Sequence, residues 1–168
     1  MIAGSYTATY QPTGLSAVDL GFTERGYLLR WNYNTDDVDA TDTYGQGTLI
    51  EQFYNGLNMW VGGVFKEYKQ GPLYAVAPWQ TFAPTGANGF SLGVIGRAAS
   101  AVGGPLILTA TAGTPAASSP ATATFPIAII DKGHQVEQLY GPTHRTTPFL
   151  FRIIPSTVSA TTRYLTTS

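Results

Sequence analysis

The chain has 168 residues and no cysteine, so it fits a single domain and has no disulfide scaffold, thiol nucleophile or thiolate metal site. Only 11% of its residues are charged, against about 25% in a typical globular protein, while threonine alone occurs 23 times. Threonine is β-branched and favours pleated strands. Because charge ordinarily keeps proteins apart, a neutral polar surface with many aromatic residues suits lasting contact with a partner.

The net charge is −1, and the nine Lys and Arg residues are scattered from Arg25 to Arg163. A tight nucleic-acid binder needs a basic face or stripe, which this distribution does not supply. Residues 1–6 carry neither the basic region nor the apolar core of a signal peptide, and no apolar run approaches the roughly 18 residues of a membrane-spanning helix. We therefore expect a protein without a signal peptide or a membrane partner.

Strand patterns begin near the N-terminus. Residues 6–10 alternate between aromatic or small residues and threonine, and a Gln-Pro-Thr-Gly turn follows. The clearest period-2 pattern covers residues 27–33, with one face made of Tyr27, Leu29, Trp31 and Tyr33. We expect this face to be buried and the opposite face to be wetter.

The alternation stops at residues 34–47, which hold four of the ten acidic residues and end in Gly-Gln-Gly. The pattern predicts a long exposed loop between early strands, and loops above about 12 residues are usually functional or disordered. Residues 48–57 are ambiguous, because their apolar positions have helical spacing over too short a run to decide. These positions are Ile50, Phe53, Tyr54 and Leu57. Residues 58–69 again predict a strand.

A second hairpin is predicted from strands at 106–112 and 121–125, with residues 113–120 as a mobile tip of small residues. Further strands are predicted at 127–130, 135–140 and 149–154, and the tail 161–168 is polar and β-prone. Many short strands separated by turns indicate a mainly β protein, a sandwich or barrel with at most one or two short helices, in one domain over residues 1–168.

Catalytic patterns are weak. Residues 89–93 match G-x-S-x-G around Ser91, but that nucleophile motif needs a following helix and a downstream acid and histidine. No helical pattern follows, and Asp131 with His134 or His144 would have to supply the other two roles. We interpret the motif as part of a glycine-rich segment and predict no enzyme activity, no catalytic residue and no small-molecule substrate.

Metal and cofactor patterns are equally incomplete. His134 and His144 are the only histidines and lack zinc-ligand spacing. An acidic cluster would offer calcium several carboxylates, but it departs from the EF-hand spacing and lacks the final glutamate. It consists of Asp36, Asp37, Asp39 and Asp42. A solvated acidic loop is favoured. Gly45-x-Gly47 lacks the third glycine of a dinucleotide site, so we predict no metal and no cofactor.

Three stretches together resemble tail tube and related tail proteins of tailed bacteriophages. They are VDLGFTERGY at 18–27, DTYGQGTLIEQFYNG at 42–56, and PLILTA at 105–110 with GTPAA at 113–117. The likeness runs from about residue 6 to residue 152. These are patterns of small, turn and strand residues, and no single residue is diagnostic.

The resemblance implies a β-sandwich or barrel flanked by a short helix, a place in the virion tail and assembly in the host cytoplasm. Six copies would close into a ring, and rings would stack into a tube through which DNA passes transiently during genome ejection. Partners would be copies of the chain and other tail or connector proteins. The family's long loop contacts the neighbouring ring, and by position it corresponds to residues 34–47. The implied contact residues are Asn34, Asp36, Asp37, Asp39, Asp42, Tyr44, Gly45 and Gly47.

Two alternatives stay open. The first is a neighbouring virion component, namely a tail terminator, a head–tail connector or a capsid decoration protein. The second, of another class, is a β-sandwich module that binds carbohydrate or a receptor, with Trp60 or Trp79 stacking on a sugar, although core burial is the commoner fate of tryptophan.

Overall fold

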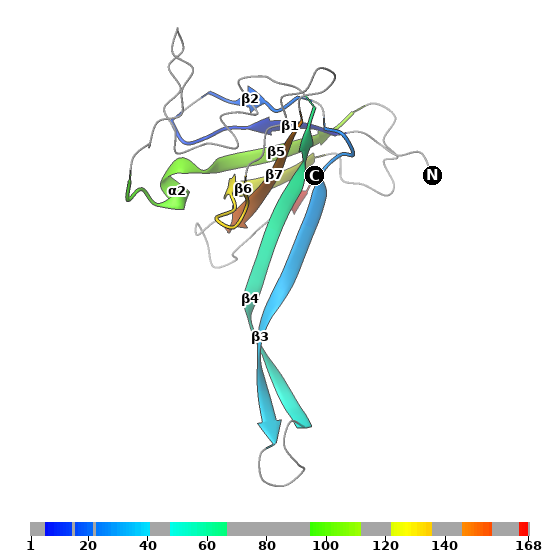
Figure 1. The fold of residues 1–168 in the computed structure, drawn as a ribbon, viewed down its shortest axis with the longest axis vertical. Helices are drawn as coiled ribbons and strands as arrows, with labels where there is room; N and C mark the ends of the chain where they lie inside the picture. Colours follow the sequence, from blue (N-terminus) through cyan, green and yellow to red (C-terminus); the bar gives the residue numbers. More distant parts are fainter. Residues whose placement is uncertain are drawn as a thin grey trace.

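The computed structural model describes residues 6–14, 16–21, 23–40, 48–66, 95–111, 122–135, 146–155 and 165–167. Within these residues the chain is mostly strand with one short helix, so the expected mainly β fold is confirmed (Figure 1). The elements are β1 (Tyr6–Tyr10), β2 (Val18–Asp19), β3 (Leu28–Ala40), β4 (Thr48–Phe65), α2 (Ala99–Val102), β5 (Gly104–Ala110), β6 (Thr122–Ile130), β7 (Thr147–Ile154) and β8 (Thr166–Thr167).

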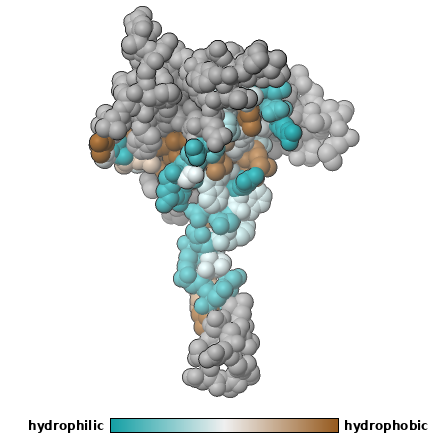
Figure 2. All heavy atoms as spheres, in the orientation of Figure 1, coloured by the Kyte–Doolittle hydropathy of each residue, from teal (hydrophilic) through white to brown (hydrophobic). Residues whose placement is uncertain are grey.

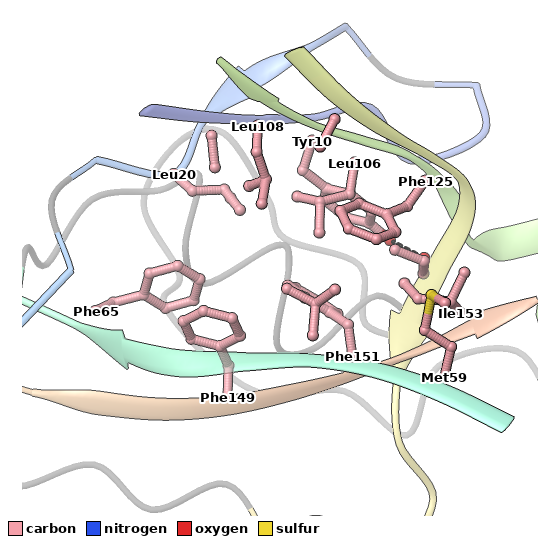
Figure 3. Close-up of a cluster of buried hydrophobic side chains, with 14 residues drawn as sticks. Tyr10, Leu20, Met59, Phe65, Leu106, Leu108, Phe125, Phe149, Phe151 and Ile153 are labelled. Atoms are coloured by element: carbon pink, nitrogen blue, oxygen red, sulfur yellow. Dashed lines mark hydrogen bonds between the residues drawn. The ribbon is translucent and has the colours of Figure 1, made fainter. Parts of the chain in front are cut away.

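The strands form one antiparallel sheet in the order β2-β1-β5-β6-β7-β4-β3, with β8 paired to β6 off this path. The sheet changes direction at β6, whose first part pairs with β5 and whose last four residues pair with β7. An irregularity in the β5–β6 register lies opposite Pro126, which has no N–H to give to the ladder. The sheet therefore folds over, with β1 and β5 above the core and β4 and β7 below it (Figure 3).

The folded sheet is not a closed barrel. Its path ends at β2 and β3, which do not pair with each other within the described part of the chain. The segment after β2 approaches β4 instead, through an isolated bridge between Thr23 and Phe65 and a hydrogen bond from Glu24 N to Val64 O of 2.9 Å. These contacts draw the two layers together on that side without completing a ladder.

The core lies between the two layers and is aromatic at its centre (Figure 3). Every second residue of β7 is buried, as expected for a strand with one face on the core. Phe149 stacks on Phe65 with ring centroids 4.0 Å apart, and Phe151 lies 5.5 Å from Tyr10 on the opposite layer. Burial of each such ring contributes about 1.5–3 kcal/mol. The Phe149–Phe65 contact stabilises the lower layer, and the Phe151–Tyr10 contact joins the two layers.

Two glycines permit close approaches in this core. A Cβ at Gly63 would lie 2.8 Å from Phe149 Cζ, so a side chain there would displace the ring from Phe65. A Cβ at Gly104 would lie 1.7 Å from the carbonyl oxygen of Gln11, where the end of β1 meets the start of β5. Only glycine fits where two backbones come this close.

Several predicted strands are confirmed, namely residues 6–10, both arms of the hairpin built from β5 and β6, and residues 149–154. The predicted strand at 127–130 is the continuation of β6. The predicted tip at 113–120 and most of the predicted strand at 135–140 lie outside the described residues.

The prediction of a loop from residue 34 was wrong as far as residue 40, because β3 continues without interruption to Ala40. The ambiguity at residues 48–57 resolves as strand, since β4 begins at Thr48. The expected burial of one face of residues 27–33 holds in part. Tyr27 and Leu29 are half-buried, whereas Trp31 and Tyr33 are exposed, because the hairpin runs past the edge of the core.

In the part of the chain that the structure describes, no helix is long and apolar enough to cross a membrane.

Candidate assembly interface

The most conspicuous surface feature is a projecting hairpin formed by β3 and β4 (Figure 1). β4 pairs with β7 only from Met59 onward, so among the described residues no third strand joins the hairpin beyond this point. We call residues 31–40 and 48–58 the arm, and the other described residues the body. The arm lies outside the two layers that enclose the core.

The arm is held together by amide side chains that bridge its two strands. Asn58 Nδ2 donates to Asn34 Oδ1 at 2.9 Å, and Gln52 Nε2 donates to Asp37 Oδ1 at 2.8 Å. Asn55 Nδ2 donates to Asp36 Oδ2. Hydrogen bonds to a charged acceptor are stronger than neutral ones, so two aspartates serve to tie the strands together.

Two irregularities interrupt the arm's ladder. The register shifts between Asn34 and Thr35, leaving Asn55 as an extra residue beside Gly56, and it shifts again between Val38 and Asp39. Gly56 has φ +138°, a conformation that residues with a Cβ rarely adopt. Bulges increase the local twist of a strand pair, so the arm is a twisted ribbon.

The arm and its root carry most of the large hydrophobic side chains that are exposed among the described residues. Six of the seven large hydrophobic side chains that are exposed there belong to β3 or β4. They are Leu28, Trp31, Tyr33, Val38, Phe53 and Tyr54. Figure 2 shows the coloured part of this projection as mostly hydrophilic and near-neutral residues, with a small hydrophobic area next to its grey end. Exposed apolar side chains gathered on one element are typical of surfaces that meet a partner, so the arm is the candidate interface.

The pairing register assigns these side chains to two faces, because paired residues in an antiparallel ladder lie on the same face. Trp31 pairs with buried Met59, so it continues the core face outward, and Tyr33 lies two residues further along. Tyr54 joins this face, with its ring centroid 6.0 Å from that of Tyr33 in an edge-on contact. These three rings are 54%, 64% and 62% exposed, so this face of the arm is uncovered within the described part of the single chain.

Charge is divided unevenly between the hairpin and the rest of the chain. No Lys, Arg or His occurs in residues 31–65, which contain five of the ten acidic residues and therefore carry a net charge of −5. The remaining residues hold all nine Lys and Arg against five acidic residues, a net charge of +4. The net charge of −1 thus conceals two oppositely charged parts.

An open groove of about 640 Å³ lies in the body at the root of the hairpin. Its exposed apolar lining comes from Leu28 and Leu150, while Arg25 and Arg30 supply positive charge and Glu24 one negative charge. Gly62 contributes no side chain, and a Cβ there would lie 3.1 Å from Leu150 Cδ1. The groove is therefore a partly apolar depression lined by two arginines and one glutamate.

A polar cluster fixes the outer face of β4 and β7. Trp60 Nε1 donates to Asp131 Oδ1 at 3.3 Å, and Arg152 Nη2 donates to Asn58 Oδ1 at 3.2 Å. Trp60 pairs with Arg30 on one side and Arg152 on the other, so the indole stands between two arginines on this face. Arg152 thereby links the body to the root of the arm.

The residues considered for a catalytic triad are engaged in structural contacts where the structure describes them. Asp131 Oδ2 accepts from Gly133 N at 3.1 Å, and its Oδ1 accepts from Trp60. His134 Nε2 lies 3.2 Å from the carbonyl oxygen of Pro148. Asp131 and His134 thus have separate side-chain partners. Ser91 and His144 lie outside the described residues.

Half of the predicted contact residues can be placed. Asn34, Asp36, Asp37 and Asp39 all lie in β3 on the arm. The others, Asp42, Tyr44, Gly45 and Gly47, lie outside the described residues. Successive strand residues point to opposite faces, so Asp36 and Asp37 are not placed to share one ion. Among the described residues, no three acidic or histidine side chains are grouped to hold a metal.

Sequence reasoning missed the exposed aromatic residues of the arm, which it assigned to a core face or left ambiguous. The signal that would have found them is the run of 35 residues, 31–65, without a positive charge. Such a run combines apolar and acidic residues on one element, which is typical of a surface that meets a basic partner.

No model of a known protein family matches the chain, and no curated protein matches its sequence. The fold and the arm alone define its class, which is a mainly β protein with a projecting two-stranded arm.

Proposed function

We propose that the protein is a non-catalytic virion subunit, namely the tail tube subunit of a tailed bacteriophage. Copies would form rings of six, and the rings would stack into the conduit for the genome. The observation that carries this proposal is the arm, which presents exposed aromatic residues on a ribbon outside the core. The resemblance of residues 18–27, 42–56, 105–110 and 113–117 to tail proteins supplies the particular class.

The arm has the properties of an element that is completed by a partner. A two-stranded ribbon is at best marginally stable alone in water, and this one carries apolar side chains on both faces. The long edges of both strands are unpaired beyond Met59 within the described part, which leaves backbone donors and acceptors open to another chain. A neighbouring subunit would cover these groups.

Assembly through the arm is heterologous, because the arm of one copy meets a different surface of the next. Such contacts close into a ring when the rotation divides a full turn and otherwise continue as a filament. The tube of a phage tail needs a contact that closes within each ring and a contact that continues from ring to ring along the stack. The few scattered positive charges are also suitable for a conduit, since a wall that held phosphate would retard the DNA.

The test is the state of the purified protein in solution, measured by sedimentation velocity and negative-stain electron microscopy. We expect rings or tubes from the intact chain. The matched control replaces residues 35–55 by Asn-Gly, which shortens the arm to a tight hairpin and leaves every core residue in place. This control should fold and remain monomeric.

A wild-type chain that stays monomeric at high concentration, and is found in no particle, would overturn the proposal. Copy number per particle then separates the tube subunit from a tail terminator, connector or decoration protein, because tube subunits scale with tail length. A specific hit in a glycan-binding screen, lost on Trp60→Ala, would favour the carbohydrate-binding alternative.

A further inference from the structure

We propose that the groove at the root of the hairpin is the receptor for the outer part of the arm of a second copy. The inference rests on the proposed self-assembly and adds the surface that receives the arm. It does not depend on the phage assignment. Its basis is the match between the charges and apolar side chains of the two surfaces.

One face of the outer arm combines apolar anchors with carboxylates. Asp36 pairs with Phe53 and Val38 pairs with Glu51, and Asp36 and Val38 are two residues apart on β3, so all four side chains share one face. All four residues are exposed. We call this set the acidic apolar face of the arm.

The groove offers the complementary set. Leu28 and Leu150 provide apolar surface, and the guanidinium groups of Arg25 and Arg30 supply opposite charge that outweighs the single carboxylate of Glu24. An aromatic side chain such as Phe53 fits a depression of this size, with its flanking carboxylates directed to the arginines. Charge pairs of this kind set the orientation and rate of docking, while the buried aromatic anchor supplies affinity.

The occupant must come from another molecule. Arg30 lies in the groove and Asp36 lies six residues further along the same strand, a separation of about 20 Å at the rise of an extended chain. The arm points away from the body, so its outer face does not fold back onto its own root (Figure 1). The negative arm and the positive remainder of the chain make a second copy the complementary partner.

The contact gives each copy one arm that inserts into a neighbour and one groove that receives the arm of another neighbour. Every molecule inserts its arm into one neighbour and receives the arm of another, so the assembly has a direction and leaves one free arm and one free groove at its ends. Because the charges are exposed before docking, salt at several hundred millimolar should weaken the contact, since the screening length falls to a few ångströms.

Charge reversal tests the pairing directly. Arg30→Glu places a carboxylate in the groove, and Asp36→Arg places a guanidinium on the arm. Each variant alone should lose assembly by at least about tenfold in sedimentation velocity, because like charges then face each other. An equimolar mixture should regain it, since the reversed arm fits the reversed groove and the two unchanged surfaces still match.

Two controls keep the test decisive. Arg97→Glu reverses an exposed charge outside the groove lining and should leave assembly unchanged. Asp36 also accepts a hydrogen bond from Asn55, so Glu51→Arg serves as a second arm variant that retains this bond. Circular dichroism melts check that each variant is folded.

The outcomes separate the inference from the proposed function. If the wild type does not assemble, both fail. If the wild type assembles and Arg30→Glu assembles equally well, the groove is not the receptor, while the proposed function stands. Loss in both single variants without recovery in the mixture also overturns the arm-to-groove contact and indicates that another surface or partner meets the arm.

Discussion

Two tyrosines at the core, Tyr10 and Tyr27, differ in whether the hydroxyl group has a hydrogen-bond partner among the described residues. The hydroxyl of Tyr10 crosses the core and donates to the carbonyl oxygen of Ala128 at 3.1 Å. The hydroxyl of Tyr27 is buried without a hydrogen-bond partner among the described residues, while its ring centroid lies 6.1 Å from that of Phe149. Burial raises the pKa of both phenols, and the carboxylate of Asp19 adds to the effect at Tyr27.

Replacing each tyrosine by phenylalanine should therefore have different effects. Tyr10→Phe leaves the Ala128 carbonyl without its donor and should lower the free energy of unfolding by about 1–2 kcal/mol. Tyr27→Phe removes an unpaired hydroxyl, so stability should stay the same or rise. Denaturant midpoints of the two variants measure the difference. Equal losses would mean that the Tyr27 hydroxyl has a partner in solution.

The raised pKa values also predict sensitivity to alkali. An unfolded tyrosine ionises near pH 10, whereas these two buried phenols keep their protons to higher pH. Their stabilising contribution is complete below about pH 10 and is lost above it, because the unfolded chain releases its protons first. Thermal melts between pH 9 and pH 11 should fall less steeply for Tyr10→Phe than for wild type. An identical slope would contradict the burial of this phenol.

At the scale of elements, strands that have one face on the core could be predicted from the sequence, and the arm could not. β7 shows why the first succeeds, because the core selects apolar residues at every second position. The arm has no core on either side, so its acidic run shows no alternation and looked like a loop. A strand held by cross-strand amides and aspartates leaves no periodic apolar signal.

The helical spacing in residues 48–57 has a specific cause. Tyr54 and Leu57 are three residues apart, yet both lie on the core-side face, since Tyr54 pairs with Thr35 and Leu57 with Tyr33. The extra residue Asn55 at the bulge shifts the alternation by one. A single bulge thus converts a period of two into a spacing of three, which imitates a helix.

The same bulge makes Gly56 a sensitive position. Its φ of +138° disfavours any residue with a Cβ, although no atom lies within 4 Å of where that Cβ would be. Gly56→Ala should therefore destabilise the arm by about 1 kcal/mol through backbone strain alone. Hydrogen exchange of arm amides should accelerate, while protection in β5 and β7 stays unchanged.

Gly96→Ala is the matched control for this prediction. Gly96 has φ +84° and equally open surroundings, but it lies before α2 and away from the arm. It should leave arm exchange unchanged. Equal acceleration in both variants would show that the effect is global destabilisation rather than strain at the bulge.

The whole molecule combines a body with its own core and an arm without one. The acidic cluster was predicted to be exposed, and Asp36 and Asp37 are exposed, although they lie in strand β3 rather than in a loop. The groove could not be predicted from the sequence, because its lining residues come from distant positions and meet only through the folded sheet. Examples are Arg25, Gly62, His134 and Phe149. Pairing across a sheet that bends at β6 is not encoded in any local pattern.

If neighbouring copies complete the arm, its local stability should depend on protein concentration, whereas that of the body should depend on it much less. A partner present at 100 times its dissociation constant adds about 2.7 kcal/mol to whatever it holds. Hydrogen exchange should be measured at low and at high protein concentration. The protection of the amides of the arm should rise strongly with concentration. The variant with residues 35–55 replaced by Asn-Gly should show no such rise anywhere. Assembly seen by sedimentation with unchanged protection of the arm would mean that other surfaces hold the copies together.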